Sequence, residues 1–566
     1  MHLNIEKHLH VKYNFFQKKT GPQIKGPAII HLLKKEMMLI LQNITYIHPN
    51  RDLLFSDISL TINRQDKIAL TGNNGTGKST LLKILSGNLQ PSKGLVKADV
   101  QPYYVPQILG QFNHLTIAEA LQIDQKLKAF AEILDGQVTD ANLELLGDDW
   151  TIEERCREAF SKWKLEGLDL AQKMETLSGG QKTRVFLAGI DIHQPEAVLL
   201  DEPSNHLDAF SRNQLYAYIK STKNTLVVVS HDRALLDLLD TVCELSHRGI
   251  TVYGGNYAFY AAQKMIESEA LSQDLKNKEK ALRKAKETEK ESLERQQKLD
   301  ARGKKKQEKA GLPTISMNTL KNNAEKSTSR MKNVHAEKVG AISGELGQLR
   351  KALPGTDKMK LDLDHSGLHK GKVLVAAKDI QFGYDNHELW PQALNFQIHS
   401  GERIAFEGAN GSGKTTLIRM ILGRLEPRSG TIIRAGSETI YMDQDYSLID
   451  DALSVYEQAQ AYNSGSLQEH EVKIRLNRFL FTSAYWDKPC KALSGGEKMR
   501  LMLCSLTISN QAPDIIVLDE PTNNLDLQNI AILTAAINEY QGTLLVVSHD
   551  TRFLEEIHVE RSIFLG

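Results

Sequence analysis

The stretch "LTGNNGTGKSTLLKILSG" (Leu70–Gly87) decides the fold, because it fits the pattern G-x-x-x-x-G-K-[ST] between a strand-like run and a helical run. Glycines let the backbone curl around a phosphate group, so that its N–H groups and the N-terminus of the following helix face the anion. The stretch recurs as "FEGANGSGKTTLIRMILG" (Phe406–Gly423). Two copies of one motif predict two related α/β domains in tandem.

Three more segments occur twice, in the same order after each phosphate loop. They are "LSGGQKTRVFLA" (Leu177–Ala188) and "LSGGEKMRLMLC" (Leu493–Cys504), "AVLLDEPSNHLD" (Ala197–Asp208) and "IIVLDEPTNNLD" (Ile515–Asp526), and "TLVVVSHDR" (Thr225–Arg233) and "TLLVVSHDTR" (Thr543–Arg552). Gln107 precedes Leu177 by 70 positions, whereas Gln444 precedes Leu493 by only 49. The first copy therefore carries about 21 extra residues, which we place within Leu127–Trp150 because that segment has helical apolar spacing.

Both phosphate loops are predicted to bind a nucleotide. Lys78 and Lys414 would bridge the β and γ phosphates, and Ser79 and Thr415 would ligate Mg²⁺. The predicted cofactor-binding residues of the loops are Gly72, Asn73, Asn74, Gly75, Thr76, Gly77, Lys78, Ser79, Thr80, Gly408, Ala409, Asn410, Gly411, Ser412, Gly413, Lys414, Thr415 and Thr416.

Two apolar strands end in a pair of acids, as expected in a buried parallel sheet whose carboxyl edge holds the ligand. In "VLLDE" and "IVLDE", Asp201 and Asp519 are predicted to belong to the Mg²⁺ shell. Glu202 and Glu520 would polarise the attacking water, since hydrolysis needs a base in line with the γ phosphate.

Composition limits the other possibilities. The 566 residues include 70 basic and 70 acidic side chains, so a basic coat over the whole surface is excluded and any nucleic-acid contact must be local. The four cysteines form no CxxC pair, and no apolar run approaches the ~20 residues that cross a bilayer. Residues 1–36 lack the apolar core of a secretory signal and receive no function. We expect a cytoplasmic protein.

The serine and two glycines of "LSGGQ" and "LSGGE" open a helix and form a second anion cradle in each copy. At this point the chain resembles the ATP-binding-cassette ATPases, over Leu39–Gly255 and Val373–Gly566. The resemblance implies that each nucleotide is sandwiched between the phosphate loop of one domain and this signature motif of the other.

The resemblance also assigns roles by position. It implies that Ser178, Gly179, Gly180 and Gln181 bind the nucleotide held by Lys414, and that Ser494, Gly495, Gly496 and Glu497 bind the one held by Lys78. It makes Gln107 and Gln444 sensors of Mg²⁺ and the attacking water, His231 and His549 switch residues at the γ phosphate, and Asp208 and Asp526 couplers of the two sites. Tyr384 takes the position that stacks on adenine; the first copy offers His48 there, with Tyr46 nearby.

Within the family, "DEPSNHLD" resembles the motif of the ABC-F group of soluble tandem-cassette translation factors. The second copy departs from that motif at Asn524, where histidine is usual. ABC-F proteins carry a helical-hairpin linker that reaches the ribosomal exit site and the tRNA near the peptidyl-transferase centre, and often an insert called the arm. Residues 258–370 match such a linker, and the extra residues of the first copy match a short arm.

The linker concentrates positive charge where the hairpin should turn. Lys264–Lys338 holds 20 basic and 12 acidic residues, and Arg295–Lys332 alone holds 11 basic and 3 acidic ones, so the whole net charge of +8 lies near the tip. Lysine and arginine bind phosphates through counterion release, which predicts contact with rRNA or tRNA. The predicted contact residues are Arg302, Lys304, Lys305, Lys306 and Lys309.

We therefore predict an α/β protein with two tandem P-loop ATPase domains (37–257 and 371–566) joined by a long antiparallel helical hairpin (258–370), acting as a monomer whose domains pair with each other. The predicted function is ATP-driven binding to the ribosome, in normal translation or in antibiotic protection, with ATP and Mg²⁺ as cofactors. Three alternatives remain at this stage: a transporter motor, a coiled-coil DNA-repair ATPase, and a disordered linker in place of the hairpin. Missing cysteine motifs disfavour an iron–sulfur recycling factor.

Overall fold

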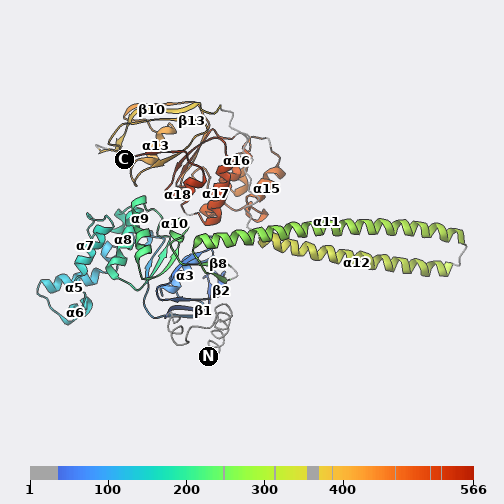
Figure 1. Ribbon diagram of the computed structural model, residues 1–566, viewed down its shortest axis with the longest axis horizontal. Helices are drawn as coiled ribbons and strands as arrows, with labels where there is room; N and C mark the ends of the chain where they lie inside the picture. Colours follow the sequence, from blue (N-terminus) through green and yellow to red (C-terminus); the bar gives the residue numbers. More distant parts are fainter. Residues whose placement is uncertain are drawn as a thin grey trace, which may run out of the picture.

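The computed structural model describes residues 36–246, 249–310, 314–352, 369–384, 387–465, 467–509, 512–523 and 525–565. Two α/β domains lie side by side, and a long pair of helices extends away from both of them (Figure 1). The predicted fold class is thus confirmed. The first 35 residues, Asn524 and residues 311–313, where the sequence predicts that the hairpin turns, lie outside the described residues.

Domain 1 contains two sheets. The larger has the order β5-β6-β7-β3-β8-β9 and is parallel except for its last pair, and the smaller is an antiparallel sheet of order β2-β1-β4. The strands are β1 (Met37–Ile47), β2 (Leu53–Asn63), β3 (Lys67–Thr71), β4 (Lys93–Ala98), β5 (Tyr103–Val105), β6 (Ala197–Asp201), β7 (Thr225–Val229), β8 (Thr241–Ser246) and β9 (Gly249–Tyr253). The helices are α3 (Lys78–Leu85), α4 (Ile117–Ala120), α5 (Asp124–Leu134), α6 (Asp140–Leu146), α7 (Ile152–Lys162), α8 (Gly179–His193), α9 (Ala209–Ser221) and α10 (Arg233–Leu236).

Domain 2 repeats this plan with a parallel sheet of order β16-β17-β18-β14-β19 and an antiparallel sheet of order β13-β10-β15. The strands are β10 (Val373–Gln381), β11 (Gly383–Tyr384), β12 (His387–Glu388), β13 (Leu394–His399), β14 (Arg403–Glu407), β15 (Ser429–Arg434), β16 (Thr439–Met442), β17 (Ile515–Asp519), β18 (Thr543–Val547) and β19 (Arg561–Phe564). The helices are α13 (Lys414–Ile421), α14 (Val455–Ala461), α15 (Glu469–Arg478), α16 (Gly495–Ile508), α17 (Leu527–Glu539) and α18 (Thr551–Glu556).

The central strands are apolar throughout because both of their faces are covered. Side chains alternate between the faces of a strand, so β6 sends Val198 and Leu200 into the core under α7 and α8, and Ala197 and Leu199 into the core against α3 and the antiparallel sheet. β17 divides its residues between two cores in the same way. This double burial fixes the register of each strand, and with it the position of the acid at its carboxyl end.

The linker is a pair of antiparallel helices, α11 (Tyr257–Ala310) and α12 (Thr314–Ala352). At 1.5 Å per residue, α11 is about 80 Å long. Lys278 pairs with Glu345 across the hairpin, and Leu346 of α12 is buried near its base. The helices exclude the disordered alternative for the described part of the linker.

The extra residues of the first copy form a small helical projection, α5 and α6, at the end of domain 1 remote from the linker (Figure 1). Asn142 of α6 donates a hydrogen bond to Glu132 of α5 at 2.9 Å, and Lys126 pairs with Asp149 at 3.0 Å, so the projection is tied together by polar contacts. The helical structure expected for this segment is observed.

Candidate functional site

Each phosphate loop connects an interior strand of a sheet to a helix: β3 to α3 in domain 1, and β14 to α13 in domain 2. Gly77 has a φ of 96°, and a Cβ at this position would lie 2.7 Å from the Leu54 side chain, so only glycine fits. The lysine that follows folds back over its own loop. Lys78 Nζ donates to Gly72 O at 2.7 Å, and Lys414 Nζ donates to Gly408 O at 2.8 Å.

The predicted metal ligands meet at the carboxyl ends of β6 and β17. Ser79 Oγ donates to Asp201 at 3.1 Å, and Thr415 Oγ1 donates to Asp519 at 3.3 Å. Burial raises the pKa of both aspartates above the ordinary carboxyl value. Each site thus presents a hydroxyl and a carboxylate beside the phosphate-loop lysine.

We did not predict the tyrosines that hold these aspartates. Tyr104 OH donates to Asp201 Oδ2 at 3.0 Å, and Tyr441 OH donates to Asp519 Oδ2 at 2.9 Å. The two tyrosines lie three residues before Gln107 and Gln444, which are exposed just beyond β5 and β16. Alignment of the two copies contained this signal, because tyrosine occupies the same position in both.

The predicted catalytic glutamates lie directly after β6 and β17 and contact the switch histidines. Glu202 Oε1 lies 3.3 Å from His231 Nε2, and Glu520 Oε1 lies 3.4 Å from His549 Nε2, without hydrogen-bond geometry in either pair. Burial raises the pKa of Glu202 to about 8 and that of Glu520 to about 7. Burial lowers the pKa of His231 to about 3 and that of His549 to about 4, so both histidines are neutral at pH 7.

Buried polar atoms without partners cluster at these pairs. Among the described residues, Glu202 Oε1, His231 Nδ1, Glu520 Oε2 and His549 Nε2 are buried and have no hydrogen-bond partner. Buried polar atoms are normally hydrogen-bonded, and an unpaired one costs roughly 1–3 kcal/mol. The two pairs therefore retain unused hydrogen-bonding capacity for a polar ligand.

The signature serines cap the helices that they open. Gln181 N donates to Ser178 Oγ at 3.3 Å while Gln181 Oε1 accepts from Ser178 N at 2.9 Å, which is a capping box at the start of α8. Ser494 and Glu497 form the same box at the start of α16. Gly179, Gly180, Gly495 and Gly496 occupy the first turns of these helices, whose free N–H groups make an anion site.

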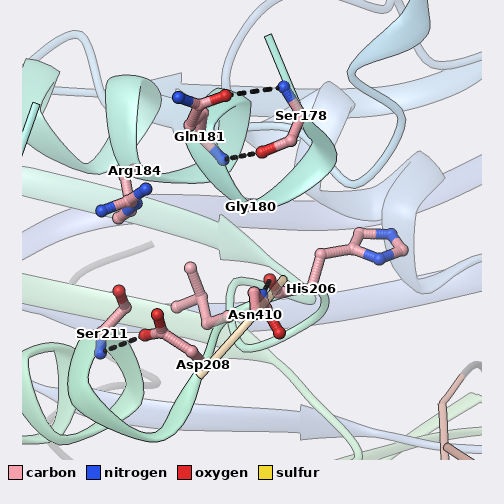
Figure 2. Close-up of a pocket in the computed structure, with 9 residues that line it drawn as sticks. Ser178, Gly180, Gln181, Arg184, His206, Asp208, Ser211 and Asn410 are labelled. Carbon is pink, nitrogen blue, oxygen red and sulfur yellow. Dashed lines mark hydrogen bonds between the residues drawn. The ribbon is translucent and has the colours of Figure 1, made fainter. Parts of the chain in front are cut away.

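The second phosphate loop faces the first signature, as the family resemblance implies. Asn410 Nδ2 donates to His206 O at 3.0 Å, and a Cβ on Gly180 would lie 2.7 Å from the same carbonyl oxygen and 3.6 Å from Asn410 Nδ2. Figure 2 shows these groups around a cavity of about 260 Å³. The lining residues are Ser178, Gly180, Gln181, Arg184, His206, Leu207, Asp208, Ser211 and Asn410.

The first phosphate loop contacts domain 2 through the equivalent position, Asn74. Asn74 N donates to Asp526 Oδ2 at 3.1 Å, while Asp526 Oδ1 accepts from Asn529 N and caps α17. One carboxylate thereby accepts a hydrogen bond across the domain interface and also caps a helix. Asp208 caps α9 in the same way through Ser211 N. Both phosphate loops therefore contact the opposite domain.

Tyr384 lies beside the second loop but is half exposed, with 51% of its surface accessible. Its hydroxyl lies 3.2 Å from Thr416 Oγ1 on α13, and Phe382 packs edge-on against its ring. This position is compatible with stacking on a base, which remains a prediction. In domain 1, Tyr46 and His48 pack against each other edge to face.

An ion-pair cluster joins the two domains beside the root of the linker. Arg233 of α10 donates to both carboxylate oxygens of Glu556 on α18, at 2.7 and 2.8 Å. Arg552 donates to Asp237 at 3.3 Å, and the other oxygen of Asp237 accepts from the backbone N–H of Ala258 in the first turn of α11. α10 and α18 each follow a switch histidine, so this cluster links both sites to the linker.

Comparison with known proteins agrees with this geometry. The sequence profile of the ABC transporter family matches residues 55–205 and 391–523. The putative ATP-binding protein YdiF of Bacillus subtilis is 31% identical over 537 residues, which cover 89% of this chain and 77% of that protein. The probable ATP-binding protein YbiT of Escherichia coli O157:H7 is 30% identical and covers 92% of this chain and 94% of its own. ABC transporter F family member 5 of Arabidopsis thaliana is 29% identical, and the match covers 89% of this chain and 72% of that protein.

This chain is an ATP-binding-cassette protein of the ABC-F type. The predicted ATPase activity follows from its two nucleotide-binding domains. Among solved structures, the archaeal ribosome recycling factor aABCE1, in complex with the ribosomal stalk protein aP1, has the same fold, with a TM-score of 0.57 at 20% identity over 92% of this chain and 87% of that one. In the part of the ABC-F protein that the structure describes, no helix is both long and apolar enough to span a membrane.

Proposed function

We propose that this ABC-F protein is a ribosome-associated ATPase that closes its domains around two ATP molecules, binds the ribosome in that state and leaves after hydrolysis. One observation carries the proposal: a long helical hairpin with a basic tip is rooted at the ion-pair cluster that joins the two ATP sites. The hairpin root contacts groups that follow both switch histidines. Changes at the nucleotides can therefore reach the hairpin.

The residues of each site fit ATP with Mg²⁺. Mg²⁺ prefers a few carboxylate and hydroxyl oxygens together with phosphate oxygens, and Ser79 with Asp201, like Thr415 with Asp519, supplies such a pair. When bound, Mg²⁺ neutralises charge on the phosphates. Gln107 and Gln444, which are exposed just beyond β5 and β16, are proposed to join this shell.

The glutamates are proposed to orient the attacking water and accept its proton. Burial raises the pKa of Glu202 to about 8, which favours the protonated carboxyl at pH 7. The positive charge of Lys78 opposes this shift and favours the carboxylate. His231, neutral and with an unpaired nitrogen, is suited to share a hydrogen bond with the γ phosphate.

The hairpin tip is proposed to enter the ribosomal exit site and approach the tRNA near the peptidyl-transferase centre. Arg302 is exposed on α11, and the side chains of Lys304, Lys305, Lys306 and Lys309 lie outside the described part of the structure. A net charge of +8 confined to this end favours RNA phosphates. The consequence for the ribosome would be modulation of translation or protection from antibiotics, in the cytoplasm. The recycling factor that shares this fold forms a complex with a ribosomal stalk protein, which is compatible with this partner.

Trapping the closed state tests the proposal. Glu202→Gln with Glu520→Gln should bind ATP without hydrolysing it, and should co-sediment with ribosomes only when ATP is present. Lys78→Ala with Lys414→Ala is the matched control, because it removes the phosphate contacts and should stay free. A double glutamine variant that sediments free of ribosomes with ATP present contradicts the proposal.

A translation assay separates the two consequences for the ribosome. If the protein protects ribosomes, adding it should restore peptide synthesis inhibited by a drug that binds near the peptidyl-transferase centre, without changing uninhibited synthesis. If it assists elongation, it should change synthesis in the absence of any drug. Imaging the trapped complex would locate the tip in either case.

A further inference from the structure

Domain 1 places a buried arginine at the catalytic centre of domain 2. Arg212 lies in the first turn of α9, which Asp208 caps, and only 9% of its surface is exposed. Its guanidinium donates to the backbone carbonyl of His549 at 3.2 Å, across the interface. On its own side it lies 3.8 Å from Asp232, an ion pair at the outer limit of contact.

The charge of Arg212 acts on both reacting side chains of the second centre. Its guanidinium bonds the backbone carbonyl of His549, and Nε2 of the same histidine lies 3.4 Å from Glu520 Oε1. Burial lowers the pKa of His549, and Lys414 and Arg212 lower it further. A buried guanidinium therefore lies next to the pair formed by His549 and Glu520.

The described residues give the first centre no arginine at the equivalent position. Ile530 occupies the equivalent position, the fourth residue of α17, where it is 2% exposed and belongs to the apolar core of domain 2. The charges acting on Glu202 come from its own domain: Lys78, Asp201 and Asp232. From domain 2 this centre receives a carboxylate instead, since Asp526 acts on Lys78.

We propose that Arg212 is a positioning residue supplied in trans to the second ATP site, which holds the His549 loop through its carbonyl and adds a positive charge beside Glu520. The two ATP sites are therefore unequal, and the second hydrolyses ATP faster than the first. A cation near the reacting oxygens stabilises the charge that develops in phosphoryl transfer. The proposal rests on ATP hydrolysis alone and is independent of the ribosome as partner.

Variants in which only one of the two ATP sites can hydrolyse ATP test whether the sites are unequal. Glu202→Gln leaves the second centre as the working one, and Glu520→Gln leaves the first. Arg212→Met preserves the length of the side chain and removes its charge. In the Glu202→Gln background it should lower kcat by about tenfold, which is the order expected for the loss of one charge-assisted hydrogen bond. The KM for ATP should stay within about twofold. In the Glu520→Gln background, kcat should change by less than about twofold. Arg212→Lys should recover much of the lost rate, because charge rather than packing is responsible.

Equal loss in both backgrounds, a rise in KM alone, or no rescue by lysine overturns the proposal, since each indicates a purely structural role. Thermal unfolding of each variant checks that the chain is folded. Single-turnover hydrolysis by the protein with both glutamates intact gives a second measurement. Arg212→Met should slow the formation of the half of the product that comes from the second site and leave the rate of the other half unchanged. Slowing of both halves, or of neither, contradicts the inference.

Discussion

Tyr104 and Tyr441 fix the orientation of the aspartates that end β6 and β17, because each phenol holds one carboxylate oxygen. Replacing both with phenylalanine removes one hydrogen bond to a mostly buried acid at each site, worth roughly 1–3 kcal/mol. We expect the Mg²⁺ concentration for half-maximal ATPase activity to rise about three- to tenfold, measured by Mg²⁺ titration at saturating ATP. Tyr103→Phe is the matched control, since the Tyr103 hydroxyl donates to the backbone carbonyl of Phe186. An unchanged Mg²⁺ requirement in the double variant would show that the phenols do not orient the acids.

Glu202 makes the stability of the nucleotide-free protein depend on pH. Its pKa is about 8 in the folded chain and 4.5 ordinarily. Between these values the folded state holds a proton that the unfolded chain has released, so this carboxyl destabilises the fold as pH rises from about 4.5 to 8. Glutamine does not titrate, so Glu202→Gln should unfold at the wild-type temperature near pH 5 and at least about 3 °C higher at pH 8.

The measurement is thermal unfolding at several pH values with a chelator and no nucleotide. His231 has a depressed pKa in both proteins, so its contribution largely cancels in the difference. Glu555→Gln, at an exposed position on α18, is the control and should show no pH-dependent gain. A Glu202→Gln variant whose advantage is the same at pH 5 and pH 8 would contradict the assigned burial effect.

At the scale of elements, the contact between α10 and α18 couples the two domains. Only 9% of the Arg233 surface is exposed, so this ion pair is better shielded from water than a surface ion pair. One nitrogen of the Arg233 guanidinium donates a hydrogen bond to each carboxylate oxygen of Glu556. Arg233→Gln and Glu556→Gln should each lower the ATPase rate about fivefold, and the double variant should lose no more than either single one. Losses that multiply would show that the two residues act separately.

The exposed pair Arg157 and Glu153 on α7 is the control for this cycle, because its side chains are 76% and 57% exposed. Glu153→Gln should leave the ATPase rate unchanged. The comparison separates an effect of the interface from a general effect of removing a charge.

Elements with a strong local pattern were predictable. The phosphate loops, the apolar strands that end in acids and the two long helices of the linker follow from contiguous residues, because each is specified by spacing within one segment. The short helices α10 and α18 were not predicted. Each is an unremarkable turn after a switch histidine, and its importance comes from the partner that it meets in the other domain.

At the scale of the whole molecule, the hairpin carries the charge that we assign to RNA binding. Changing Lys304, Lys305, Lys306 and Lys309 to alanine should weaken binding of the trapped protein to ribosomes about 10- to 100-fold and reduce the salt dependence of binding, because fewer phosphate counterions are released. Basal ATPase activity without ribosomes should stay within about twofold. Sedimentation at several salt concentrations measures the first effect.

Lys276, Lys280, Lys284 and Lys286 provide a matched set of four exposed lysines midway along α11. Changing these to alanine should have a much smaller effect on ribosome binding. Equal losses from both sets would show that the hairpin binds through general charge rather than through its tip.

In the candidate site, too, some features were predictable from sequence and others were not. Lys78, Ser79, Asp201, Glu202 and His231 were identified from sequence, and the structure brings them together. Gln107 is exposed just beyond β5, and its role at the metal stays a prediction, whereas the hydrogen bond from Tyr104 to the aspartate was not predicted. Motif position predicts the neighbourhood of a residue, whereas the side-chain contact depends on packing around it.

The sequence by itself determined that the protein has two ATP-binding domains, an intervening helical hairpin and a basic tip, because each depends on residues close together in the chain. Tertiary structure alone decided which groups meet across the interface. Asn74 and Asp526 are separated by 452 positions, and Asn410 and His206 by 204. Arg212 and Ile530 were visible as a difference between two copies, but only the docking of the domains places Arg212 against His549, which contacts Glu520, while Ile530 lies in the core of domain 2.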